Sequence, residues 1–164
     1  MIHTHPIISL MLIFSTGWNT CICAPPMNWK KATPIEFEYS KNVFIGEVTV
    51  CDDENYEMVI CEVFKGELTV GQMITGKNRG TCGPYVDKNG EWIMFGEYTT
   101  EFTVNDCGIS MSMTDPRMLP PPPPSNDDRQ EQKFIATWKA ESKKNRQEQL
   151  KILRKISVKN DSIS

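Results

Sequence analysis

Six cysteines, all within the first 107 of 164 residues, constrain this fold more than any other feature of the chain. An even number of cysteines in a chain with the character of an exported protein favours disulfides over free thiols. Their positions alone select no connectivity. A structural zinc site is the alternative, but one Cys-x-Cys followed by scattered single cysteines lacks the paired ligands of such sites. We therefore expect a disulfide-stapled domain, with cysteines at positions 21, 23, 51, 61, 82 and 107.

The N-terminal segment has the pattern of a secretory leader. Residues 6–14 (PIISLMLIF) form an apolar run that is too short to span a bilayer and has the length of a signal-peptide core. We expect residues 1–20 to be removed, which would make Cys21 the mature N-terminus. Cleavage after residues 15–17 (STG) is the alternative, because these residues fit the small-residue rule better. The chain is therefore predicted to be secreted, or periplasmic or on the cell surface in a bacterial host.

Charge divides the chain into two parts. Residues 1–125 contain 8 Lys and Arg against 15 Asp and Glu, a net charge of −7, whereas residues 126–164 contain 10 against 6, a net charge of +4. The first part carries net negative charge and so lacks the excess of basic residues that binds nucleic-acid phosphates, and we expect no nucleic-acid partner. We assign residues 21–118 to one folded domain, because its size matches a single hydrophobic core.

Five short segments of this domain have the pattern of β-strands. Residues 43–51 and 56–64 are rich in β-branched and aromatic residues, and the polar turn 52–55 joins them into a hairpin. Three further strands are expected at residues 72–76, 91–98 and 101–105. Five short strands suit a closed barrel better than an open sheet with exposed edges. The predicted fold class is therefore mainly β.

Two helical regions flank the predicted barrel. Thr33 as N-cap, Pro34 at N1 and Glu36 at N3 form a capping-box pattern, which predicts a short helix before the first strand. After a proline-rich linker, residues 119–125, comes the charged tail of residues 126–164, which we expect to be helical or partly disordered. It would dock in part on the barrel or fray into solvent. Contact of this basic tail with a membrane surface is a further alternative.

The start of the predicted mature chain, Cys21-Ile22-Cys23-Ala24-Pro25-Pro26, resembles the C-x-C-x-P-P motif of the tissue inhibitors of metalloproteinases. Residues 56–66 (YEMVICEVFKG) resemble the second strand of that family, and the Cys82-Gly83-x-Tyr85 stretch and Cys107 are similar to its two partner cysteines. The resemblance covers about residues 21–110, the inhibitory netrin-like domain. It implies a five-stranded barrel of the oligonucleotide/oligosaccharide-binding (OB) type with short helices.

The resemblance also implies a disulfide pattern, Cys21 with Cys82 and Cys23 with Cys107. These bonds would hold the ridge of residues 21–24 in one direction against the loop that ends at Cys82. Cys51 and Cys61 have no counterpart in the family pattern. A bridge between them stays open, although the two would not lie opposite each other in a hairpin centred on residues 52–55. The family's third inhibitory-domain disulfide and its second domain have no equivalent here.

The function that the resemblance implies is inhibition of a zinc metalloprotease. In the family, the α-amine and carbonyl of the first cysteine, here Cys21, chelate the zinc of the target and displace its water. Ile22 would enter the specificity pocket. The chain needs no cofactor or metal of its own, because the zinc belongs to the protease. Further protease contacts are expected from Cys23, Ala24, Pro25, Gly80 and Thr81.

Two other function classes remain. Both histidines lie in the leader, and no nucleophile motif or carboxylate pair stands out, so we do not expect an enzyme. A non-inhibitory netrin-like module, in which the cysteines only staple a protein-binding surface, is the alternative to inhibition. The position of the mature N-terminus discriminates between the two, because any extension ahead of Cys21 would block chelation. The sequence does not specify the oligomeric state or the target protease.

Overall fold

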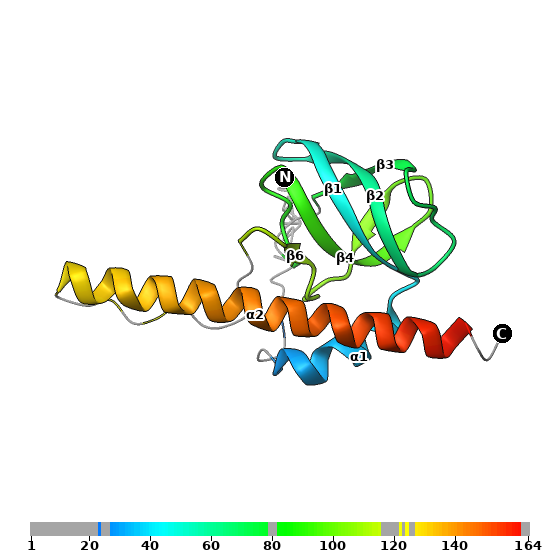
Figure 1. Cartoon of the computed structure of the whole chain (residues 1–164). Coiled ribbons are helices and arrows are strands. Elements are labelled where there is room, and N and C mark those ends of the chain that lie inside the picture. Colours follow the sequence, from blue (N-terminus) through cyan, green and yellow to red (C-terminus); the bar gives the residue numbers. More distant parts are fainter. Residues whose placement is uncertain are drawn as a thin grey trace, which may run out of the picture.

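The computed structural model describes residues 23, 27–78, 82–115, 122, 124 and 127–161. Its elements comprise two α-helices and six β-strands (Figure 1). The helices are α1 (Trp29–Tyr39) and α2 (Asp128–Asp161). The strands are β1 (Asn42–Cys51), β2 (Asn55–Lys65), β3 (Met73–Lys77), β4 (Gly90–Tyr98), β5 (Phe102–Val104) and β6 (Met111–Ser112).

Strands β1 to β5 close into a barrel. They are hydrogen-bonded in the order β1-β2-β3-β5-β4, and the additional pairing of β1 with β4 completes the ring. The pairing of β3 with β5 is parallel, and the other pairings of the ring are antiparallel. Strand β6 adds to β4 outside the ring. The predicted fold class, a mainly β chain with a five-stranded OB-type closed barrel, is confirmed.

Two glycines allow strands of the barrel to approach each other closely. A Cβ on Gly96 of β4 would lie 2.1 Å from the carbonyl oxygen of Thr103 on β5. A Cβ on Gly76 of β3 would lie 2.3 Å from ring atoms of Tyr56, which is buried inside the barrel. Only glycine leaves room at such contacts, so both positions are needed where the sheet curves and closes.

The hydrophobic core has two parts, because the strands bury residues on both faces. The first fills the barrel interior and includes the edge-to-face ring pair of Phe44 and Phe102, whose centroids are 4.9 Å apart. The second lies between the barrel and the two helices and consists of Phe37, Val43, Ile45, Phe64, Ile93, Phe95, Leu150 and Leu153. Helix α2 is therefore part of the folded domain.

Helix α1 begins five residues before the start that its sequence predicts. Asn28 is the N-cap, and its side chain accepts a hydrogen bond from the Lys30 amide at 2.9 Å. Pro34 lies inside the helix. The Thr33 hydroxyl is not a cap: it donates to the Trp29 carbonyl oxygen at 2.7 Å and accepts from Gln149 of α2 at 3.0 Å. The capping-box prediction was wrong because this buried threonine bonds to its own helix and to its neighbour.

The other end of α1 is held by Lys65, the lysine of the Phe64-Lys65-Gly66 motif at the end of β2. Its Nζ donates to the carbonyl oxygens of Phe37 and Glu38 at 2.8 and 2.9 Å. A cation at a helix C-terminus satisfies carbonyls that have no partner within the helix. Gly66 follows with a φ of +102°, where a side chain would be strained. The motif therefore joins β2 to α1 and turns the chain.

Helix α2 docks on the domain through its C-terminal half and projects beyond the barrel with its N-terminal half (Figure 1). The docked part contributes the buried Leu150 and Leu153, and Arg154 makes a two-point ion pair with Glu62 of β2 at 2.8 Å for each contact. Phe134 and Ile135, on the projecting part, are exposed. The expectation of a partly docked helical tail is confirmed. Within the described residues, no helix is long and apolar enough to cross a membrane.

Cys51 and Cys61 are free thiols, so the bridge that was left open between them is not formed. The β1–β2 register pairs Cys51 with Tyr56, which places Cys61 five residues further along β2. The Cys51 thiol instead lies 3.4 Å from the side-chain oxygen of Asn89. The separation along the hairpin explains why these two cysteines do not meet.

Candidate functional site

Three cysteines from distant segments meet at one edge of the barrel. Cys23, ahead of α1, is bonded to Cys107, which follows β5, and their Cα atoms are 5.5 Å apart. The backbone amide of Cys107 donates to the carbonyl oxygen of Cys82 at 2.6 Å, and the Cys23 sulfur lies 3.9 Å from that same oxygen. The predicted Cys23–Cys107 disulfide is confirmed.

The rest of the predicted ridge can be placed only in part. Cys82 is a disulfide cysteine, but its predicted partner, Cys21, lies outside the described residues. The same holds for the other predicted contact residues, namely Ile22, Ala24, Pro25, Gly80 and Thr81. The structure thus brings together three of the predicted disulfide cysteines, Cys23, Cys82 and Cys107.

The backbone at Cys107 is held in an unusual conformation. Cys107 has a φ of +54°, in the left-handed region that residues with a side chain seldom adopt. Beside it, the Asn105 side-chain amide donates to Glu36 and to Ser40 of the α1 segment, at 2.8 Å each. The disulfide loop is therefore tied to the C-terminal part of α1 as well as to Cys23. We missed Asn105 in the sequence because no local pattern marks an asparagine that bridges two distant segments.

The loop that starts at Cys82 is also fixed on its other side. The Tyr85 hydroxyl donates to the backbone carbonyl oxygen of Asp53 in the β1–β2 turn at 2.8 Å. Partial desolvation and the nearby Asp53 carboxylate raise the pKa of Tyr85. Asn78 exchanges two hydrogen bonds with the backbone of Val86, at 2.9 and 3.0 Å. The loop that carries Cys82 therefore spans the space between the cysteine cluster and the acidic β1–β2 turn.

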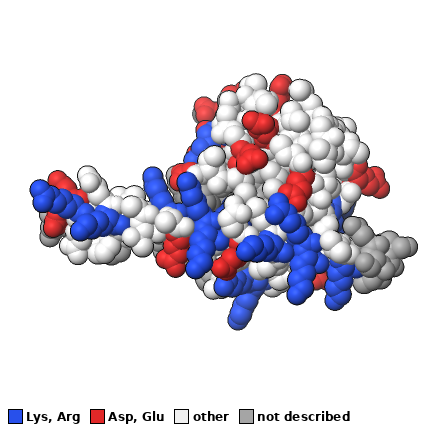
Figure 2. Space-filling model, viewed as in Figure 1, with Lys and Arg blue, Asp and Glu red and all other residues white. Residues whose placement is uncertain are grey.

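The β1–β2 turn is acidic and is bridged by internal hydrogen bonds. One carboxylate oxygen of Asp52 accepts hydrogen bonds from the amides of Glu54 and Asn55 at 2.8 and 2.7 Å, and these bonds lower the pKa of Asp52. Asp52, Asp53 and Glu54 are exposed. The turn thus presents negative charge beside the Tyr85 loop. Figure 2 shows the wider division of charge, with Lys and Arg gathered along α2 and Asp and Glu over the barrel.

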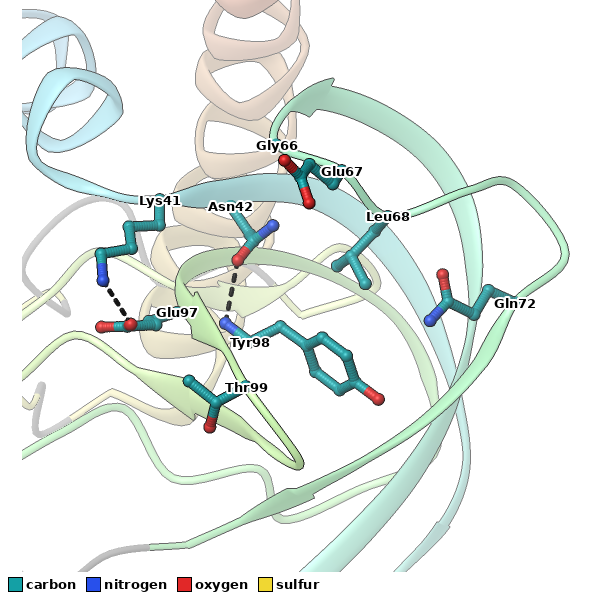
Figure 3. A pocket seen from close by; sticks show the side chains of 9 residues that line it. All are labelled: Lys41, Asn42, Gly66, Glu67, Leu68, Gln72, Glu97, Tyr98 and Thr99. Carbon is teal, nitrogen blue, oxygen red and sulfur yellow. Dashed lines mark hydrogen bonds and ion pairs between the residues drawn. The ribbon is translucent and has the colours of Figure 1, made fainter.

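A hollow lies at the start of β1. It has a volume of about 640 Å³ and is lined by Lys41, Asn42, Gly66, Glu67, Leu68, Gln72, Glu97, Tyr98 and Thr99 (Figure 3). Lys41 pairs with Glu97, and the Asn42 side-chain oxygen accepts a hydrogen bond from the Tyr98 amide at 2.8 Å. These two contacts engage Lys41, Glu97 and the Asn42 oxygen with one another. No set of three metal-binding side chains occurs in the described part of the chain.

Comparisons with known proteins do not identify this chain: no family model, no curated protein and no solved structure matches it.

Proposed function

We propose that this protein is a secreted inhibitor of zinc metalloendopeptidases that acts through a mature N-terminus at Cys21. The observation that carries the proposal is the convergence of Cys23, Cys82 and Cys107 at one edge of an OB-type barrel. A disulfide at Cys23 suits an oxidising compartment outside the cell. The resemblance of the Cys21–Pro26 segment to the inhibitor motif supplies the chemistry.

The inhibitory step would take place at the open coordination position of the protease zinc. A catalytic zinc holds three protein ligands and one water, which becomes the nucleophile of peptide hydrolysis. The α-amino nitrogen and carbonyl oxygen of Cys21 would chelate the zinc and displace that water. Ile22 would enter the adjacent specificity pocket. The protein thus acts by binding and is not itself an enzyme.

Rigidity of the ridge would contribute to affinity. A binding segment that is already ordered avoids part of the conformational entropy cost of association. The Cys23–Cys107 disulfide and the bonds of Asn105 to α1 hold the backbone from which the N-terminal residues extend. We therefore expect inhibition to depend on the Cys23–Cys107 bond, although neither residue needs to contact the zinc.

The experiment first determines the mature N-terminus by intact-mass and N-terminal peptide analysis of the secreted protein. Inhibition of a panel of zinc metalloproteases is then measured for the native protein and for a form with one alanine added before Cys21. A form with one alanine added after Ser164 is the matched control. The proposal predicts that only the N-terminal addition abolishes inhibition. Equal potency of all three forms would refute chelation by the Cys21 amine.

A non-inhibitory binding module is the second candidate function. The observation that favours it is the acidic β1–β2 turn, which Tyr85 joins to the loop that follows Cys82. This edge would bind a basic protein surface without any free amine. A mature chain that begins ahead of Cys21 and still binds a partner through the 52–54 turn would support this candidate.

A further inference from the structure

The hollow at the start of β1 contains a buried side chain with an unused donor. Asn42 is 7% exposed, and its side-chain oxygen accepts a hydrogen bond from the Tyr98 backbone amide at 2.8 Å. Its Nδ2 forms no hydrogen bond to any described residue and points into the hollow (Figure 3). Because the partner is a backbone N–H, the Asn42 amide cannot be flipped without losing this bond. Its two N–H groups therefore face whatever fills the hollow.

A second amide of the hollow is fixed in the same way. The Gln72 side-chain oxygen accepts hydrogen bonds from the backbone amide of Thr69 at 3.1 Å and from its hydroxyl at 3.4 Å. The Gln72 nitrogen has no partner among the described residues and is turned toward the hollow (Figure 3). Asn42 on β1 and Gln72 just ahead of β3 thus direct two amide nitrogens into one space.

The hollow also contains a carboxylate that no cation neutralises. Lys41 pairs with Glu97, so the charges of these two lining residues cancel. The exposed Glu67 carboxylate forms no ion pair or hydrogen bond within the described part of the chain. The buried Leu68 and the half-buried Tyr98 add apolar surface to the lining. Amide donors, a free acceptor and an aromatic ring therefore surround one space of about 640 Å³.

This combination of groups selects against ions and favours hydroxyl groups. The Glu67 carboxylate repels an anion, and the N–H groups of Asn42 and Gln72 turn the positive ends of their dipoles toward a cation. A hydroxyl suits both kinds of group, because it donates one hydrogen bond and accepts two. The C–H face of a sugar ring can also pack on the Tyr98 ring. The hollow has room for such a ligand, since small-molecule sites usually measure about 300–1,000 Å³.

We propose that this hollow binds a neutral saccharide. Hydroxyl groups of the sugar donate hydrogen bonds to the Glu67 carboxylate and accept hydrogen bonds from Asn42 Nδ2 and Gln72 Nε2. The sugar ring lies against Tyr98. None of these residues belongs to the predicted N-terminal ridge, so saccharide binding is a second function of the barrel and does not depend on zinc chelation.

The test is a titration of the ¹⁵N-labelled whole secreted protein followed by NMR. The sugar probes are glucose, galactose, mannose and N-acetylglucosamine. Sodium acetate, tetramethylammonium chloride and N-methylacetamide stand for an anion, a cation and a peptide group. We expect saturable shifts of the side-chain amide signals of Asn42 and Gln72 with at least one sugar. The proposal is overturned if no sugar moves these signals at concentrations that fill a millimolar site, or if one of the other three probes moves them as strongly.

Variants separate the site from a general effect on the fold. E67Q removes the carboxylate, and Q72E keeps the oxygen that Thr69 bonds while it removes the amide donor. E57Q is the matched control, because Glu57 is exposed on β2 and does not line the hollow. We expect the dissociation constant of the sugar to rise roughly tenfold in E67Q and Q72E, the loss typical of one hydrogen bond to a charged group, and to stay unchanged in E57Q. Equal affinity of wild type and all three variants would overturn the proposal.

Discussion

Replacing Leu153 with alanine tests whether α2 is part of the folded domain. Leu153 is fully buried between α1 and the barrel, where it belongs to the cluster that contains Phe37, Val43 and Phe95. The substitution removes three carbon atoms, worth about 0.8 kcal/mol each in lost burial, or about 2.4 kcal/mol. The cavity left behind raises the total loss of unfolding free energy to about 3–4 kcal/mol. This is a large part of the 5–15 kcal/mol that is usual for a domain.

Urea unfolding followed by tryptophan fluorescence measures this loss, because Trp29 and Trp92 are buried reporters. With a slope of about 2 kcal/mol/M, a loss of about 3 kcal/mol lowers the midpoint by roughly 1.5 M. Val158→Ala is the control, since Val158 lies on the same helix but is 67% exposed. It should cost less than about 0.5 kcal/mol. Equal midpoints for the two variants would refute the docked position of α2.

Three further predictions concern the barrel surface and closure. Gly96→Ala should prevent folding or destabilise the domain by more than about 3 kcal/mol, since its Cβ would lie 2.1 Å from the Thr103 carbonyl oxygen. Circular dichroism and urea unfolding measure this loss; Gly71→Ala is the comparison, because its Cβ would meet no atom and only the strain of its positive φ opposes the side chain. Arg154 lowers the pKa of Glu62, so their ion pair stabilises the fold above pH about 4.5, and this stabilisation is lost as pH falls through the folded-state pKa of Glu62. E62Q should remove the stabilisation, at a cost below about 1 kcal/mol near pH 7. Identical curves of stability against pH for wild type and E62Q would contradict the ion pair. The exposed Cys61 should react with maleimide faster than the half-buried Cys51. The rate at Cys61 should rise with pH because the thiolate is the nucleophile, and burial raises the pKa of Cys61, so the rise lies at higher pH than for an ordinary thiol. Peptide mass spectrometry measures both rates, and a Cys51–Cys61 disulfide would be the contrary result.

The barrel could be predicted from the sequence because its strands carry local signals. The β-branched and aromatic residues of 43–51 and 56–64, joined by a polar turn, predicted β1 and β2 to within about one residue of their ends. Strand β6 has only two residues, Met111 and Ser112, which is too short for any periodicity. It forms because β4 offers a free edge at Trp92 and Ile93.

The helices were harder to predict because their contacts decide their ends and faces. Both Asn28 and Thr33 are good N-caps by residue type. Only the hydrogen bond between Thr33 and Gln149 shows why Thr33 lies inside α1 and does not cap it. In α2, the polar stretch 141–149 gave no apolar stripe, yet Ser142, Arg146 and Gln149 are buried. A polar residue inside a helix interface is visible only once its partners are known. The same holds for Asn105 beneath the cysteine cluster.

The central claim is that the Cys21 amine coordinates the zinc of a metalloprotease. The most direct measurement is the visible absorption spectrum of a cobalt(II)-substituted target protease, which reports ligand exchange at the open position of the metal. If the Cys21 amine binds the metal, one equivalent of the mature protein changes this spectrum and the form with alanine before Cys21 leaves it unchanged. Inhibition without any spectral change, or the same change with the extended form, would contradict chelation by the N-terminus.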